Sequence, residues 1–204
     1  MFKNLQNKGV ALVISSPSGA GKSSLTKALI KRDHNITFST SVTTRAKRPN
    51  EVEGKDYFFV TQEKFDEMVR NNELLEFAEV FGHCYGIPRS SVLDLLDSGR
   101  DIIFDIDWQG ARIITKTLSD YVASIYILPP SVAELNNRLR KRNEDTKEDI
   151  NLRMQQVESD AAHYNEYDYV IINDDFNTAL ISLQSILVAE RHKVKRMKFS
   201  KVHV

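Results

Sequence analysis

The sequence predicts an α/β fold in which helices cover both faces of a parallel sheet. The main observation is an alternation of short apolar runs with segments whose apolar residues recur at helical spacing. The second is a glycine-rich turn, 16–23, between the first apolar run and the first helical segment. The third is composition: 204 residues, 41% hydrophobic and 27% charged, suffice for one ordinary globular core.

Each core element is predicted from its own pattern. The first strand is expected at 10–14, a largely β-branched run that ends in Ser, Pro and Gly, and the first helix at 24–31, where Leu25, Ala28 and Leu29 share one face. Further strands are expected at 102–106, 124–128 and 169–172. Further helices are expected at 111–118, 132–139 and 178–189, the last with Asn177 as N-cap.

Two stretches depart from this alternation. Residues 36–88 hold short β-like pieces at 37–42, 57–60 and 75–80 and one helical piece at 63–69, which indicates an inserted β-rich subdomain. Residues 138–164 are highly charged, with a capping-box-like start at 146–149, which indicates a helical lid over 131–167. We therefore expect a single domain, 1–204, whose core comprises 1–35, 89–130 and 168–204.

Composition excludes several classes of protein. No apolar run approaches the roughly 18 residues that cross a membrane, so no membrane partner is expected. The polar N-terminus lacks the apolar stretch of a secretory signal. A single cysteine, Cys84, excludes an internal disulfide and suits a reducing compartment. These features predict a cytoplasmic protein.

Positive charge gathers near the C-terminus, although the chain as a whole balances 28 Lys plus Arg against 28 Asp plus Glu. The basic residues are Arg191, Lys193, Lys195, Arg196, Lys198 and Lys201. A nucleic-acid-binding tail is one interpretation. A solvated, cation-rich helix end is the favoured one, because the helix dipole stabilises cations there and no aromatic residues are interleaved. We expect no nucleic-acid partner.

Residues 16–23, SPSGAGKS, match the phosphate-binding motif G-x-x-x-x-G-K-[ST], except that serine stands first. In such a loop, main-chain N–H groups surround phosphate oxygens and the next helix adds its positive N-terminus. Lys22 supplies a cation for the β- and γ-phosphates, and Ser23 a hydroxyl for Mg²⁺. A serine at position 16 is strained if that position requires positive φ. The predicted ATP-binding residues are Ser16, Pro17, Ser18, Gly19, Ala20, Gly21, Lys22, Ser23 and Ser24.

Asp105 and Asp107 lie at the end of a predicted strand, and Asp105 is predicted to hold Mg²⁺ together with Ser23. Residues 107–110, DWQG, also fit the D-x-x-G spacing of switch GTPases. Those proteins read guanine with N-K-x-D after a late strand, and the comparable segment here, 172–175, is INDD without a lysine. An insertion and an arginine-rich lid favour a phosphotransferase, which closes over its substrates to exclude water.

Seven segments together resemble the guanylate kinase family, particularly its bacterial members, in order along nearly the whole chain. They are SVTTRAKRP (41–49), GKDYFFV (54–60), EFAE (76–79), YG (85–86), DIDWQG (105–110), LPPS (128–131) and INDD (172–175). The resemblance implies a phosphate-loop NTPase core with a GMP-binding insertion and a lid. It also implies transfer of the γ-phosphoryl group of ATP, bound with Mg²⁺, to GMP.

The same resemblance implies roles for individual residues. The GMP phosphate is expected on Arg45, Arg48, Tyr57 and Tyr85, where guanidinium forks suit a dianion. The base is expected on Ser41, Glu76 and Asp107, beside Gly86, because a carboxylate accepts from guanine N1–H and the N2 amino group. Asn173 is expected near the adenine. The implied catalytic residues are Lys22, Arg45, Arg138, Arg142 and Arg153.

One departure and two alternatives accompany this assignment. Ile87 stands where the family usually has Ser or Thr, so we expect GMP binding to be weaker by about 1 kcal/mol or base choice to be somewhat relaxed. His83, Trp108 and His163 are predicted to be packing or surface residues. A non-catalytic guanylate-kinase-like binding module is one alternative, although Lys22, Ser23 and the lid arginines are intact. A kinase for another nucleoside monophosphate is the other.

Overall fold

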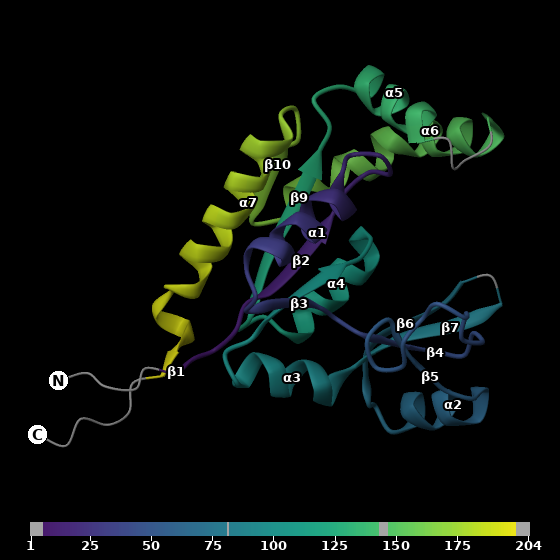
Figure 1. Ribbon diagram of the computed structural model, residues 1–204, viewed down its shortest axis with the longest axis vertical. Helices are drawn as coiled ribbons and strands as arrows, with labels where there is room; N and C mark the ends of the chain where they lie inside the picture. Colours follow the sequence, from purple (N-terminus) through teal and green to yellow (C-terminus); the bar gives the residue numbers. More distant parts are fainter. Residues whose placement is uncertain (1–5, 81, 143–146, 199–204) are drawn as a thin grey trace, which may run out of the picture.

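The computed structural model describes residues 6–80, 82–142 and 147–198, and its core is a parallel sheet with helices on both faces, as predicted (Figure 1). The central sheet has the order β10-β9-β2-β8-β3, and every neighbouring pair is parallel. Its strands are β2 (Ala11–Ser15), β3 (Ile36–Phe38), β8 (Asp101–Asp105), β9 (Val122–Leu128) and β10 (Tyr169–Ile172).

The central strand β2 contributes to a separate apolar cluster on each face of the sheet. Leu12 and Ile14 belong to the cluster that includes residues of α1 (Lys22–Arg32) and α7 (Phe176–Arg191). Ala11 and Val13 belong to the cluster that includes residues of α3 (Arg89–Asp97) and α4 (Trp108–Thr117). Successive side chains of a strand point to opposite faces, so a strand covered on both sides is apolar throughout instead of alternating.

A second sheet lies apart from the first, with the order β5-β4-β7-β6 (Figure 1). It has a small core of its own, formed by Val42, Phe65, Met68 and Leu74. Its elements are β4 (Ser41–Thr43), β5 (Tyr57–Phe59), α2 (Gln62–Arg70), β6 (Leu74–Val80) and β7 (His83–Pro88).

Several details differ from the sequence prediction, which also gave no element for α3. The strand predicted at 37–42 is divided: β3 pairs with β8 in the central sheet and β4 pairs with β5 and β7 in the second. Residues 36–38 therefore belong to the core sheet and not to the insertion. Strand β7 was not predicted because it contains Gly86 and ends at Pro88, and both residue types disfavour strands. The N-cap of α7 is Asp175, not Asn177, because its Oδ1 accepts the Thr178 N–H at 2.8 Å.

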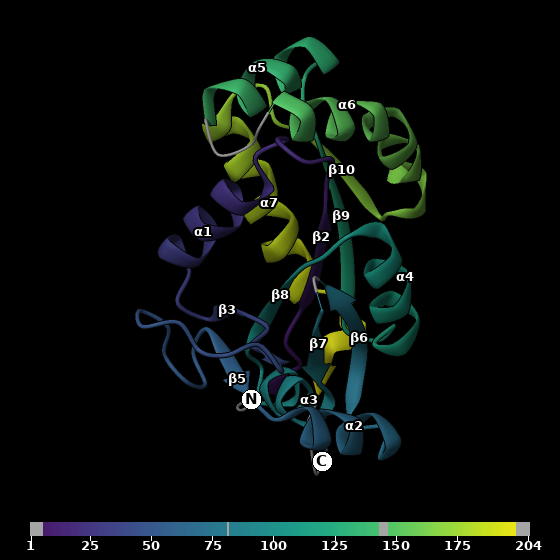
Figure 2. The same cartoon turned by 90° about the vertical axis from the view of Figure 1, so that its right-hand side faces the viewer.

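The predicted lid region is helical and lies at the end of the central sheet near the glycine-rich loop (Figures 1 and 2). It consists of α5 (Val132–Arg142), α6 (Lys147–Ala161) and the 3₁₀ helix η1 (Ala162–Glu166), and Thr146 lies outside the described residues. Leu135 and Leu139 of α5 are fully buried in the same apolar cluster as Leu12. This part of the region is thus packed onto the core.

At the opposite end of the core, β1 (Gln6–Asn7) pairs antiparallel with β11 (Met197–Lys198), which follows the short helix η2 (Val194–Arg196). Arg191 lies in the last turn of α7, but Arg196 is fully buried, so the prediction of a solvated cationic tail is wrong for this residue. Among the residues that the structure describes, no helix is both long enough and apolar enough to cross a membrane.

Candidate active site

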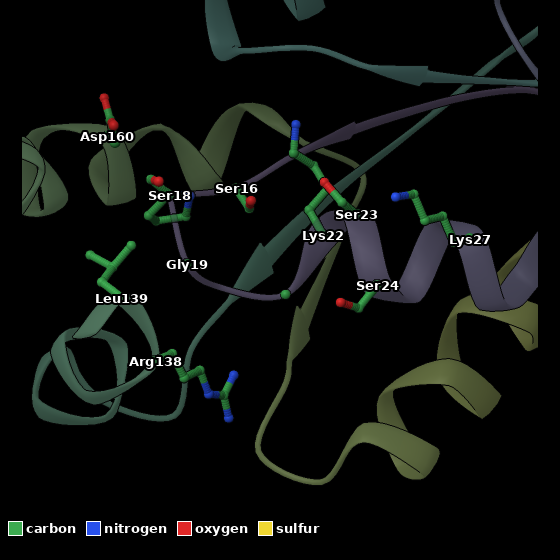
Figure 3. A pocket seen from close by; sticks show the side chains of 12 residues that line it. Ser16, Ser18, Gly19, Lys22, Ser23, Ser24, Lys27, Arg138, Leu139 and Asp160 are labelled. Atoms are coloured by element: carbon green, nitrogen blue, oxygen red, sulfur yellow. The ribbon is translucent and has the colours of Figure 1, made fainter. Parts of the chain in front are cut away.

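The glycine-rich loop connects β2 to α1 and turns through two left-handed glycines, Gly19 (φ 91°) and Gly21 (φ 96°) (Figure 3). Glycine adopts these angles without steric cost because it lacks a Cβ. Within the described ranges, the non-glycine residue with positive φ is Asn72, so Ser16 has an ordinary φ and the strain considered for it does not arise.

This loop borders a cavity of about 720 Å³. Most of the predicted ATP-binding residues line it, whereas Ala20 and Asn173 are buried behind the loop. Arg138 and Leu139 of α5 line the same cavity from the other side (Figure 3). The lining residues are Ser16, Pro17, Ser18, Gly19, Gly21, Lys22, Ser23, Ser24, Lys27, Arg138, Leu139 and Asp160.

Lys22 and Ser23 lie beside Asp105 at the end of β8. The Lys22 ammonium group forms an ion pair with the Asp105 carboxylate and lies 3.5 Å from the Ile106 carbonyl oxygen. The Ser23 hydroxyl lies 3.5 Å from the other carboxylate oxygen of Asp105. Parallel strands β2 and β8 are neighbours, so their carboxyl ends bring these groups together. The predicted cation and the two predicted metal-binding residues thus meet at one point.

A second cavity, of about 470 Å³, lies between the two sheets and begins at the same Asp105. It brings together Ser41, Tyr57, Glu76, Tyr85, Gly86 and Asp107 from the predicted GMP-binding set. Ile87 lines it as well and is 3% exposed. The Lys22–Asp105 ion pair therefore joins the lining of one cavity to the lining of the other.

Two carboxylates of this second cavity differ in their surroundings. Burial, and secondarily the negative charge of Asp107, raise the pKa of the Glu76 carboxyl group above its ordinary value. Asp107 is the N-cap of α4, where its Oδ1 accepts the Gly110 N–H at 2.9 Å. A capping hydrogen bond fixes the direction of this side chain before any ligand is present.

Arg45 lies near this cavity but is bound to Glu51. Its Nη1 donates to Glu51 Oε2 at 3.1 Å and its Nη2 donates to Oε1 at 2.6 Å, in a bidentate pair. Hydrogen bonding with Arg45 is the main cause that lowers the pKa of Glu51. The Arg45 guanidinium carbon lies 5.5 Å from the centre of the Tyr57 ring. Arg48 is exposed, and its backbone N–H donates to Glu51 at 2.8 Å.

Of the lid arginines, Arg138 is described in full. It donates to Glu134, one helical turn earlier, at 3.0 Å and lines the cavity from the α5 side (Figure 3). Arg142 is the last residue of α5 and Arg153 lies within α6, but their side chains are outside the part that the structure describes.

The lid joins the core through a cluster that the sequence did not reveal. The Trp108 ring of α4 stacks on the His163 ring at 3.9 Å, and Glu166 accepts a hydrogen bond from Arg112 and contacts His163. These contacts lower the pKa of Glu166 to about 2, chiefly through Arg112. Trp108 and His163, predicted to be packing or surface residues, thus pack on each other, and their contact joins η1 of the lid to α4 of the core.

Sequence analysis missed several polar residues near the two cavities, among them Ser39 and Asp56 on the lining of the second. Lys27 and Asp160 line the first cavity, and Glu51 binds Arg45. Lys27 was detectable in principle, because it lies four residues after Ser23 on α1 and so on the same helix face. Asp160 and Glu51 carry no comparable signal, since their positions depend on how α6 and the segment before β5 pack.

Comparisons with a family model, with related sequences and with a solved structure all identify the same family. The guanylate kinase family model matches residues 8–190. The chain is 51% identical over 189 residues to the guanylate kinase of Rickettsia felis, covering 93% of this chain and 98% of that protein. It is 48% identical to that of Paramagnetospirillum magneticum, covering 94% and 90%. The crystal structure of guanylate kinase from Anaplasma phagocytophilum superposes with a TM-score of 0.71 at 39% identity, covering 95% and 92% of the two chains.

Proposed function

This chain belongs to the guanylate kinase family and is an ATP:GMP phosphotransferase, and we propose that its two cavities hold the two substrates end to end. ATP occupies the cavity over the glycine-rich loop, and GMP occupies the cavity between the sheets. The observation that carries this proposal is the Lys22–Asp105 ion pair, which lies where the linings of the two cavities meet. The phosphoryl group would pass from one substrate to the other at this point.

On the ATP side, the loop acts through its backbone. Main-chain N–H groups between Ser18 and Ser23 surround the phosphates, and the N-terminus of α1 adds a partial positive charge. Lys22 exchanges its contact with Asp105 for the β- and γ-phosphates. Its charged partner is the partly exposed carboxylate of Asp105, with side-chain exposures of 18% for Lys22 and 27% for Asp105, so the exchange needs little rearrangement.

Mg²⁺ accompanies ATP in this proposal. The residues at the junction fit such an ion, because the Ser23 hydroxyl and the Asp105 carboxylate are the hard oxygen donors that Mg²⁺ prefers. Among the described residues, no group of three or more His, Cys, Asp or Glu side chains could hold a metal by itself. The ion is therefore expected to arrive with the phosphates and to neutralise charge on them.

On the GMP side, Arg45, Arg48, Tyr57 and Tyr85 bind the phosphate. Arg45 uses Nη1 and Nη2 for Glu51 and Nη1 also for the Ala46 carbonyl oxygen, so Nε and the second hydrogen of Nη2 are the parallel pair of donors that remains for the phosphate and for Tyr85, a further hydrogen-bonding partner of Arg45. Such a pair matches two oxygens of a phosphate. The Arg45 position is thus compatible with binding both Glu51 and GMP.

Glu76, Ser41 and Asp107 read the guanine base. The carboxylate of Glu76 accepts from N1–H and the N2 amino group, and adenine lacks this pair of donors. Because Glu76 is half-buried, a base without these donors would leave its charge without a partner. That cost is the basis of the expected discrimination.

Catalysis then rests on position and charge. The acceptor is a phosphate oxygen of GMP, which is ionised near neutral pH, so no general base is required. Arg138, with Arg142 and Arg153, supplies positive charge from the lid to the transferred group and the ATP phosphates. Closure of the lid would also exclude water, which competes with GMP as the acceptor. Asn173, which was expected near the adenine, is buried and donates to the Ala20 carbonyl oxygen of the loop. We place this activity in the cytoplasm, in keeping with the lone thiol of Cys84.

The choice of acceptor tests this assignment. Transfer from ATP to GMP, AMP and UMP is measured with the parent protein, Glu76→Gln and the control Glu79→Gln, which changes an exposed carboxylate of the same strand. We expect Glu76→Gln to lower kcat/KM for GMP by about 10²-fold and to reduce the preference over AMP. The control should match the parent. An unchanged GMP preference in Glu76→Gln would show that another residue reads the base.

A further inference from the structure

Asn173 does not lie on the lining of the ATP cavity. It follows β10, its side chain is 4% exposed, and its Nδ2 donates to the Ala20 carbonyl oxygen of the glycine-rich loop at 2.7 Å. Its backbone N–H is bound as well, by the Leu128 carbonyl oxygen at the end of β9, at 2.8 Å. Both ends of the residue are therefore held, and its amide is directed at the back of the loop.

We propose that Asn173 is a positioning residue that orients the Ala20–Gly21 peptide group and so aims the Gly21 N–H at the ATP phosphates. In a trans peptide group, the carbonyl oxygen and the following N–H point in opposite directions. Because Asn173 binds the Ala20 carbonyl on the buried side, the Gly21 N–H points to the other side, where Gly21 lines the cavity.

The packing around Gly21 supports a specific fit between the two residues. A Cβ atom at position 21 would lie 2.3 Å from the Asn173 Nδ2, which is closer than real contacts allow. Glycine is thus required at position 21 both by its φ of 96° and by the approach of this amide. The opposite peptide orientation would place the Ala20 carbonyl oxygen toward the anionic phosphates, and the amide of Asn173 disfavours it.

This inference rests on the proposed placement of ATP over the loop, and the experiment separates the two. Asn173→Asp keeps the size of the side chain but replaces the donor with a carboxylate oxygen, which repels the Ala20 carbonyl. Asn173→Ala removes the donor without adding charge. The matched control is Asp174→Asn, which makes the reverse change at the exposed neighbouring position. For each variant, KM and kcat are measured with ATP and ITP, and binding of inorganic tripolyphosphate and of GMP by calorimetry.

We expect Asn173→Asp to weaken ATP, ITP and tripolyphosphate by the same factor, about tenfold, and to leave GMP affinity unchanged. Asn173→Ala should show a smaller loss in the same direction, and Asp174→Asn none. A loss confined to ATP would mean that Asn173 reads the adenine base. An equal loss of GMP affinity would mean that Asn173 supports the fold in general. Unchanged affinity for ATP and tripolyphosphate would mean that Asn173 does not orient the loop. Each of these results would overturn the proposal. If tripolyphosphate fails to compete with ATP on the parent protein, the placement of ATP itself is wrong.

Discussion

The two ends of the central sheet hold their charged residues in different ways. At the end near the C-terminal segment, Arg196 and Glu190 are both fully buried. All five N–H donors of Arg196 have acceptors at 2.7 to 3.2 Å, namely Glu190 Oε2 and the carbonyl oxygens of Glu190, Asp120, Tyr121 and Val122. Water has no access to the Arg196 guanidinium group, and all of its partners are atoms of the protein itself.

At the other end, and around the cavity between the two sheets, the cations are partly exposed and each is bound mainly to one carboxylate. Lys22 is paired with Asp105, and Arg45 with Glu51, whose side chains are 14% and 16% exposed. A buried cation with every donor satisfied cannot change partners without a large desolvation cost, whereas a partly exposed one can. We therefore expect the first arrangement to serve the stability of the fold, and under the proposed function the second keeps cations in place for anionic substrates.

Removal of Lys22 should have the largest effect. We expect Lys22→Ala to lower the rate of transfer from ATP to GMP by about 10³-fold, because the variant lacks the cation that faces the developing charge. GMP affinity should stay close to that of the parent protein, since Lys22 belongs to the other cavity. A coupled assay measures the rate and calorimetry the affinity. Lys31→Ala, at an exposed position of the same helix, is the control. Equal losses of rate and GMP affinity would contradict the two-cavity arrangement.

At the buried end, the same kind of change should act on stability instead. We expect Arg196→Ala to lower the free energy of unfolding by about 3 to 5 kcal/mol, because it removes a fully buried cation together with its five hydrogen bonds, while Lys193 and Tyr169 still bind Glu190. Chemical denaturation measures this loss. The KM values of the protein that remains folded should not change. Lys195→Ala, at the exposed neighbouring residue, should be nearly neutral. A stable Arg196→Ala protein with altered KM values would show that Arg196 serves substrate binding and not stability.

The pH dependence of GMP binding should distinguish the half-buried Glu76 from an ordinary, exposed glutamate. The ionised form of Glu76 accepts hydrogen bonds from guanine, and burial raises the pKa of this group. As the pH falls, protonation of Glu76 therefore begins to weaken GMP binding at a higher pH than for an ordinary glutamate, by up to tenfold per pH unit below its pKa. Calorimetry from about pH 8 to about pH 5 measures this trend. Glu76→Gln controls for titration of the GMP phosphate, and identical pH profiles for the two proteins would refute the role of Glu76.

The smallest effect is expected at Ile87, on the wall of the GMP cavity. A hydroxyl group at this position would add one hydrogen bond to the base, so Ile87→Thr should tighten GMP binding by about fivefold. The same change should lower stability by about 1 kcal/mol, because Ile87 is buried in the apolar cluster of α3 and α4. Calorimetry and thermal unfolding measure the two effects. Unchanged or weaker GMP binding would show that this wall contributes only by its shape.

Much of the architecture was predictable because it depends on patterns of residues that are close together in the sequence. The alternation of strands and helices follows from the periodicity of apolar residues, and the loop conformation follows from Gly19 and Gly21, since few other residues adopt its backbone angles. Most of the predicted site residues whose side chains are described line two adjoining cavities, but Ala20, Arg45, Arg48 and Asn173 do not. Lys22, Ser23 and Asp105 meet because the parallel strands β2 and β8 present their carboxyl ends at the same edge. Strand β7 was missed, because Gly86 and Pro88 obscure a strand that tertiary pairing nevertheless stabilises.

The sequence by itself determined the fold class, the phosphate-binding loop and the residue types at the site, since these depend on neighbours along the chain. Tertiary structure alone decided which distant polar groups meet. Lys22 pairs with Asp105 across 83 residues, and Asn173 reaches Ala20 across 153. Packing also buried Arg196, which in the sequence is one of several similar basic residues. The partner of a charged side chain is decided by which segments pack around it. Because those segments are distant in the sequence, the pairing leaves no periodic signal there.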